Sequence, residues 1–131
     1  MTVYDYGDIE IPFSIVAGLW QGYDSKWSAM HDITTVINTI HGWQLKEGLN
    51  VVQTIEKLRC AGGTRSDGKP EIEDGVRITG SLPSSTPENE AWELLKQLVQ
   101  TVFGPVHEMT VIVYLNGRPR RLRPRQAAGA T

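Results

Sequence analysis

The chain has 131 residues, of which 40% are hydrophobic, and a formal net charge of −2 at pH 7. This length and apolar fraction fit one domain with a core of its own. The longest apolar run is far too short for a membrane span, the N-terminus MTVYDYGDIE lacks the regions of a signal peptide, and the single cysteine, Cys60, excludes an internal disulfide. We therefore expect a soluble, cytoplasmic protein without membrane contact.

The charges are distributed unevenly along the chain. Residues 1–117 carry eight basic and 15 acidic side chains, a formal charge of −7, whereas residues 118–131 carry five arginines and no acidic group, a charge of +5. The sequence therefore predicts a globular α+β domain over residues 1–117 and an arginine- and proline-rich basic tail over residues 118–131.

The first part of the chain predicts a strand followed by a helix. Every odd position of residues 9–19 is apolar, and this period of two is typical of a strand with one buried face. Asp24 or Ser25 is a suitable N-cap for a helix that runs to about His41, with Gly42 at its end.

The middle of the chain has a mixed pattern. In residues 43–60 apolar side chains recur at roughly helical intervals, although Gly48 weakens the pattern, and we favour a helix over about residues 50–60. Residues 61–75 are rich in turn-forming residues and predict an exposed loop or an irregular hairpin. The alternation over residues 76–82 predicts a half-buried strand.

The last third of the globular part shows the clearest pattern. Ser85 and Glu88 have the spacing of a capping box, and Thr86 before Pro87 offers a neighbouring cap with proline at the first helical position. Apolar residues then recur at three- and four-residue intervals, as in an amphipathic helix. Residues 109–115 predict a buried strand, and Asn116-Gly117 predicts a type I′ hairpin turn. The order of these elements predicts an α+β domain with about three helices packed on a small mixed or antiparallel sheet.

The sequence contains no strong catalytic, cofactor or metal motif. The GxGxxG, Walker-type, HExxH, CxxC and GxSxG patterns are all absent. We therefore predict no cofactor, and we favour a protein that is not an enzyme. A small enzyme or metal protein built around His31, His107 and Cys60 stays open as a third hypothesis, because imidazole and thiol groups serve both metals and nucleophilic catalysis.

Two groups of side chains suggest contact with a partner. Trp20 and Tyr23 flank a loop and are residue types that dominate binding hot spots, although filling the core is the other interpretation of these aromatic residues. The second group consists of the tail arginines Arg118, Arg120, Arg121, Arg123 and Arg125. Such guanidinium groups pair with acidic protein surfaces or with nucleic-acid phosphate, and a solvated extension is the remaining interpretation.

These observations lead to a functional hypothesis with one main alternative. We predict a small non-enzymatic interaction protein that binds another protein, or its own copies, through the aromatic loop and the basic tail. The alternative is a nucleic-acid-associated protein that uses the tail as a phosphate clamp.

Overall fold

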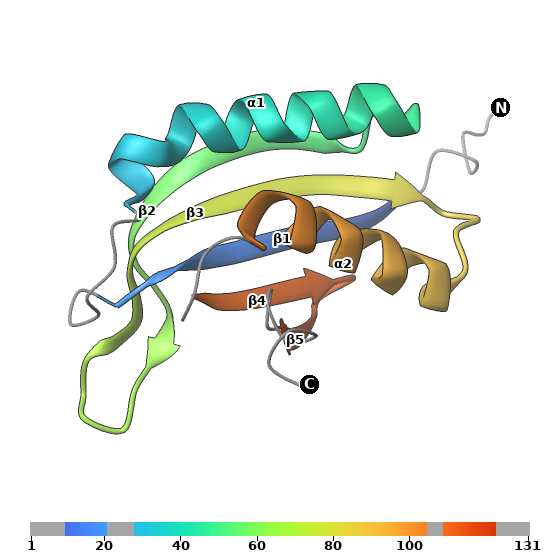
Figure 1. Ribbon diagram of the computed structural model, residues 1–131. Helices are drawn as coiled ribbons and strands as arrows, with labels where there is room; N and C mark the ends of the chain where they lie inside the picture. Colours follow the sequence, from blue (N-terminus) through green and yellow to red (C-terminus); the bar gives the residue numbers. More distant parts are fainter. Residues whose placement is uncertain (1–9, 21–27, 105–108, 123–131) are drawn as a thin grey trace, which may run out of the picture.

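The computed structural model describes residues 10–20, 28–104 and 109–122, apart from the side chains of Met30 and His31 (Figure 1). Its elements are, in chain order, β1 (Glu10–Leu19), α1 (Ala29–Glu47), β2 (Val52–Thr64), β3 (Pro70–Pro83), α2 (Glu88–Phe103), β4 (Thr110–Leu115) and β5 (Arg118–Leu122). Neither of these two helices is long and apolar enough to cross a bilayer.

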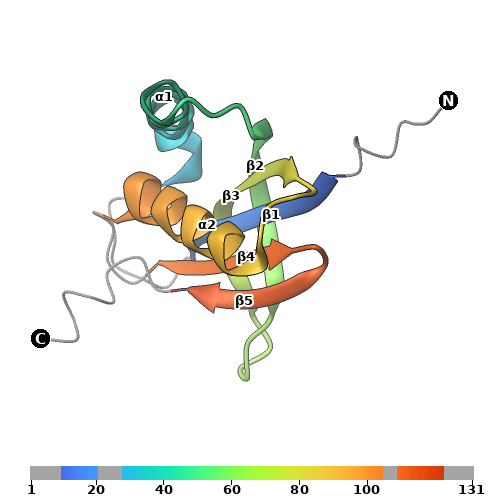
Figure 2. The ribbon, with the colours of Figure 1, turned by 90° about the vertical axis from the view of Figure 1, so that its right-hand side faces the viewer.

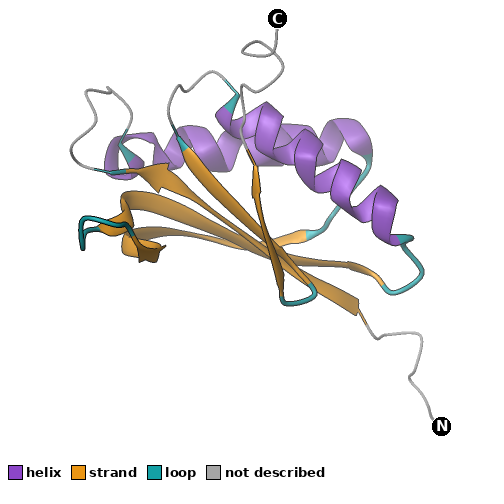
Figure 3. Ribbon diagram, turned by 90° about the horizontal axis from the view of Figure 1, so that it is seen from below, coloured by secondary structure: helices purple, strands orange, loops and turns teal. Residues whose placement is uncertain are grey.

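The five strands form one antiparallel sheet in the order β2-β3-β1-β4-β5. The chain passes from β1 through α1 to β2 and from β3 through α2 to β4, and each crossover leaves one strand position between its two strands. Both helices lie on the same face, so the molecule has one helical layer and one sheet layer (Figures 2 and 3). This is the ferredoxin-like β-α-β-β-α-β arrangement with β5 added at one edge.

The prediction of three helices on a small mixed or antiparallel sheet is wrong, because the described part of the chain has two helices on a five-stranded antiparallel sheet. The error lies in residues 50–60, which belong mainly to β2 and pair with β3. The start of this segment is rich in β-branched residues, namely Val51, Val52, Thr54 and Ile55. A pleated strand accommodates such side chains better than a helix does, and pairing with a distant strand outweighs the local helical pattern.

The C-terminal end of α1 also differs from the prediction. The helix passes through Gly42, where an added Cβ would meet nothing within 4 Å, and ends at Gly48, which has a left-handed φ of 69°. The Oε1 atom of Gln44 then accepts hydrogen bonds from the backbone N–H groups of Val51 (2.7 Å) and Val52 (3.0 Å). These two bonds fix the turn that leads the chain into β2.

Two carboxylates hold the start of α1. The backbone N–H of Ser28 donates to Asp32 at 3.0 Å, and the N–H of Ala29 donates to Asp74 of β3 at 3.1 Å. The second bond ties the first turn of the helix to the sheet and places negative charge at the positive end of the helix dipole. The predicted N-cap residues, 24 and 25, lie outside the described residues.

The sequence pattern of residues 61–75 is compatible with an exposed loop or with an irregular hairpin, and the structure contains the hairpin. β2 and β3 remain paired as far as Thr64 and Pro70, with a register shift between Ala61 and Thr64. The turn closes where the N–H of Arg65 donates to the carbonyl of Lys69 at 2.7 Å.

The second half of the fold follows the predicted pattern more closely. The buried residues of α2 are Ala91, Trp92, Leu95, Leu98, Val99 and Phe103. The strand predicted over residues 109–115 is β4, which lies between β1 and β5. Asn116 and Gly117 have the positive φ values, 53° and 82°, that a type I′ turn requires. The capping box does not form, because α2 begins after Pro87 without a side-chain cap.

The face of the sheet opposite the helices carries a small apolar cluster of its own. Val16, Ile72 and Ile112 are buried but lie outside the core beneath the helices. The hairpin of β2 and β3 folds against this cluster, because a Cβ added at Gly62 would lie 3.4 Å from the side chains of Ile72 and Ile112. At Gly62 the hairpin is therefore packed on this face of the sheet.

Candidate functional site: the groove between the two helices

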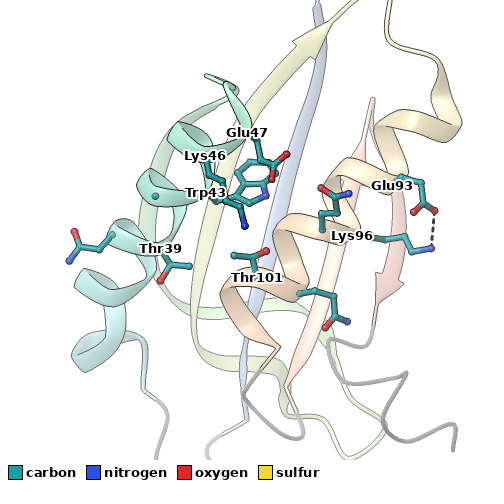
Figure 4. Close-up of a pocket in the computed structure, with 11 residues that line it drawn as sticks. Thr39, Trp43, Lys46, Glu47, Glu93, Lys96 and Thr101 are labelled. Atoms are coloured by element: carbon teal, nitrogen blue, oxygen red, sulfur yellow. Dashed lines mark hydrogen bonds and ion pairs between the residues drawn. The ribbon is translucent and has the colours of Figure 1, made fainter.

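A groove of about 700 Å³ runs between α1 and α2 (Figure 4). Its α1 wall consists of Asn38, Thr39, Gly42, Trp43, Lys46 and Glu47, and its α2 wall consists of Glu93, Lys96, Gln97, Gln100 and Thr101. Small-molecule sites typically measure about 300–1,000 Å³, so the groove has a suitable size. Most of the lining side chains are exposed, so a ligand can reach them from solvent.

Helical spacing explains why these side chains share one groove. On α1, Thr39, Trp43 and Glu47 are four residues apart and therefore lie one above the other on a single face. Three lining residues of α2 repeat this spacing, namely Glu93, Gln97 and Thr101. Two complementary stripes of side chains thus line the groove along both helices.

Trp43 forms the floor of the groove. Its side chain lies between the two helices, is only 6% exposed and belongs to the core cluster (Figure 4). Packing from below therefore fixes the indole, and its remaining surface is presented to the groove. A buried aromatic ring held in this way gives the groove a fixed apolar floor, and a ligand can contact its small exposed part.

Charged groups of both signs border the groove. Lys46 and Glu47 lie beside Trp43, while Glu93 and Lys96 pair with each other at 3.2 Å on α2 (Figure 4). The second pair is exposed and contributes little to stability. Glu47 forms no ion pair with any residue in the described ranges, so its carboxylate is available to a ligand. The groove also offers hydroxyl and amide groups, from Thr39, Thr101, Asn38, Gln97 and Gln100.

The predicted partner-binding residues lie elsewhere. Trp20 follows β1 directly, and its ring is covered by the guanidinium of Arg65 at 3.7 Å, with the ammonium of Lys69 at 5.7 Å. Both cations come from the turn of the β2–β3 hairpin, so Trp20 helps to hold that turn. Tyr23, together with residues 123 and 125, lies outside the described residues.

Three of the tail arginines form part of β5 and contact their own chain. The contacts are Arg118 with Glu88 (3.6 Å), Arg120 with the Trp92 ring (4.0 Å to its centre) and Arg121 with Glu71 (2.9 Å). Alternation along the strand directs the first two toward α2 and Arg121 toward the opposite face. The hydrogen bond to Glu71 raises the pKa of the Arg121 guanidinium. Binding of a partner by these arginines stays a prediction.

Among the residues of the enzyme-or-metal hypothesis, Cys60 is the one whose side chain is described. It is exposed on β2 at a positive φ of 62°. His107 and the side chain of His31 lie outside the description. Within the described ranges, no group of three or more His, Cys, Asp or Glu side chains could hold a metal ion.

The sequence pattern did not reveal the groove. The predicted helix ends at Gly42, so it contains Thr39 but not Glu47. The prediction therefore misses the stripe of groove residues that continues along α1 to Glu47. The stripe on α2 resembles an ordinary solvated face, because nothing local indicates that a second helix lies opposite. A continuous helix up to Gly48 would have shown the first stripe.

No protein-family model matches the sequence, and a search of curated proteins found no relative. Among solved structures, the chain is similar to a phage SAM lyase in complex with S-methyl-5′-thioadenosine. The TM-score is 0.56 and the sequence identity 12%, over 94% of this chain and 95% of that chain. At this identity the likeness shows a shared fold.

The comparison corrects the prediction of a non-enzymatic interaction protein. That prediction depended on missing motifs and on charge segregation, whereas the solved structure that shares the fold over almost its whole length is an enzyme. Missing motifs are weak evidence, because a fold can bring together single polar residues from separate elements. The charge segregation has a structural explanation as well, since the β5 arginines contact side chains of α2 and β3.

Proposed function

We propose that the protein is an enzyme that binds S-adenosylmethionine in the groove between α1 and α2 and cleaves it, releasing S-methyl-5′-thioadenosine. The observation that carries this proposal is the shared fold with a phage SAM lyase over 94% of this chain and 95% of that one. The groove supports it independently, because it has the size of a small-molecule site and contains a fixed aromatic ring beside an available carboxylate.

The lining of the groove matches the chemical parts of this substrate. The small exposed part of the Trp43 indole offers an apolar contact for the S-methyl group or the edge of the purine. Glu47, one helical turn further on, places a carboxylate where it can attract the sulfonium or the substrate ammonium group. Lys46 can pair with the substrate carboxylate, and Gln97 and Thr101 can bond the ribose hydroxyls and the purine edge.

The reaction breaks the bond between the sulfur and the γ-carbon of the substrate. Both bonding electrons go to sulfur, which changes from a sulfonium cation to the neutral thioether of S-methyl-5′-thioadenosine. The four-carbon fragment either loses a proton to a base or forms a ring through its own carboxylate. The leaving group needs no proton in either case, so the protein has to hold the substrate, orient the four-carbon chain and keep water away from it.

Glu47 can act in two ways, and kinetics separates them. A carboxylate beside the sulfonium stabilises the bound cation, but that charge disappears as the bond breaks, so this interaction favours substrate binding and lowers KM. A carboxylate that takes a proton from the four-carbon chain acts in the transition state and raises kcat. The split between KM and kcat therefore identifies its role.

The test is to incubate the full chain with S-adenosylmethionine and to measure S-methyl-5′-thioadenosine by chromatography. We expect Glu47→Gln to lower kcat/KM about tenfold or more, because charge-assisted contacts to a ligand are among the strong ones. Glu56→Gln is the matched control, since Glu56 is an exposed carboxylate on β2 whose pair with Arg77 spans 3.8 Å. Circular dichroism checks that both variants are folded.

A second variant tests the position of the site. Gly42→Phe places a ring in the groove, where a Cβ meets nothing within 4 Å, and we expect it to abolish binding of the substrate without unfolding the helix. Formation of the product at the normal rate in Gly42→Phe would move the site away from the groove. No product and no calorimetric binding of S-adenosylmethionine by the wild-type chain would refute the proposed function.

A further inference from the structure

A second, smaller cavity of about 100 Å³ lies near the start of α2. It is lined by Ile11, Thr86, Glu88, Ala91, Trp92, Leu115, Asn116 and Arg118. None of these residues lines the groove between the helices, so the cavity is a separate feature of the surface.

The inner part of the cavity is apolar and firmly held. Ala91 and Trp92 of α2 meet Ile11 of β1 and Leu115 of β4 there, and three of these four side chains are buried. The guanidinium of Arg120 lies 4.0 Å from the centre of the Trp92 ring and keeps the indole in place. The floor is therefore formed before any ligand arrives.

The volume limits what the floor can receive. A protein cavity of about 150 Å³ holds benzene, which has six carbon atoms. At that ratio, about 100 Å³ takes a group of about four carbon atoms. This is the size of a short aliphatic side chain and is too small for a purine.

The rim carries one charge of each sign. Arg118 and Glu88 approach each other to 3.6 Å, and their side chains are 70% and 64% exposed. A pair so exposed stabilises the fold little, so either member can exchange its partner for a ligand group. A ligand that is only anionic would meet the carboxylate of Glu88, and one that is only cationic would meet the guanidinium of Arg118. The rim therefore favours a ligand that carries both charges close together.

We propose that this cavity binds a free α-amino acid with a short aliphatic side chain, such as L-leucine. The side chain enters the apolar floor, the carboxylate binds the guanidinium of Arg118, and the ammonium group binds the carboxylate of Glu88. Thr86 and Asn116 provide further polar atoms at the rim. The proposal is independent of the cleavage reaction, because it depends on other residues.

The experiment is a titration of the isotope-labelled full chain with L-leucine, followed by NMR through the indole N–H signal of Trp92. We expect this signal to shift, with a dissociation constant on the order of 1 mM, as befits a small ligand with few contacts. Glycine, which lacks the side chain, and 3-methylbutylamine, which lacks the carboxylate, should bind at least about tenfold more weakly.

Two exposed substitutions test the charges without threatening the fold. Arg118→Gln and Glu88→Gln should each weaken L-leucine binding about tenfold or more, whereas Glu90→Gln, at an exposed position of the same helix that lines neither cavity, should leave it unchanged. No shift of the Trp92 signal at about 20 mM L-leucine, a concentration well above the expected constant, would overturn the proposal. So would equal binding in the two charge variants, or a response centred on the Trp43 indole signal.

Discussion

α1 and α2 lie side by side on the same face of the sheet, yet they are attached to it in different ways. α2 buries a continuous stripe along its length, namely Ala91, Trp92, Leu95, Leu98, Val99 and Phe103. The buried side chains among those described in α1 are fewer, namely Ala29, Val36, Ile40 and Trp43. A hydrogen bond to Asp74 at the start of α1, and bonds from the backbone N–H groups of Val51 and Val52 to Gln44 near its end, supplement this packing. Packing along the whole of α2 therefore sets the position of the α2 wall of the groove. The position of the α1 wall depends in part on the hydrogen bonds at the two ends of α1.

The largest expected effect concerns packing on α2. Leu98 is fully buried in the core, so Leu98→Ala should lower the free energy of unfolding by about 2–5 kcal/mol, through lost apolar burial and the cavity that remains. Ile33 of α1 is half-buried, and Ile33→Ala should cost less than about 2 kcal/mol. Urea unfolding measures both. Equal losses would mean that packing attaches both helices equally well.

A smaller effect is expected where hydrogen bonds fix the end of α1. Gln44→Ala removes the oxygen that accepts from the N–H groups of Val51 and Val52, and leaving such groups unpaired should cost about 1–3 kcal/mol. Gln44→Glu keeps an acceptor oxygen at the same place and should lose less. Hydrogen exchange of the two amides supplies a local readout. Unchanged protection in Gln44→Ala would show that this contact does not hold the turn.

The smallest expected effects come from two glycines, one inside α1 and one at its C-terminal cap. Their substitution by alanine should change the stability in opposite directions. Gly48 has a φ of 69°, so Gly48→Ala forces an L-residue into a left-handed conformation and should destabilise the protein by about 1–2 kcal/mol. Gly42 lies inside the helix with open space around it, so Gly42→Ala should stabilise it by about 0.5–1 kcal/mol. Thermal unfolding of the two variants should give shifts of opposite direction. Shifts of the same sign would contradict the position of the helix end.

The elements of the fold that could be predicted are those whose sequence patterns lie within a short segment of the chain. The apolar stripe of α2, the short strand β4 and the turn at Asn116-Gly117 depend on residues close together in sequence, and the structure shows all three. β2 depends on pairing with β3, and its own sequence is ambiguous between helix and strand. The prediction failed there because a tertiary partner, absent from any local window, decides the outcome.

The candidate site was harder to predict than the fold. The groove exists because Thr39, Trp43 and Glu47 face a similar stripe on α2, and the two helices are separated in sequence by an entire hairpin. The arginines gave a conspicuous signal, but charge alone does not distinguish a contact within the chain from a contact with another molecule. Arg118 and Arg121 contact Glu88 and Glu71 of their own chain.

The position of β5 matters for any shortened form of the protein. β5 covers the outer edge of β4, pairing from Leu115 with Arg118 to Val111 with Leu122. A chain cut after Gly117 would thus lose a whole strand along with its cations, and the apolar strand β4 would become the rim of the sheet with its backbone groups unpaired. Such a rim is a template for strands from other molecules and promotes aggregation. Single substitutions in the intact chain are therefore the sounder way to learn what the arginines do.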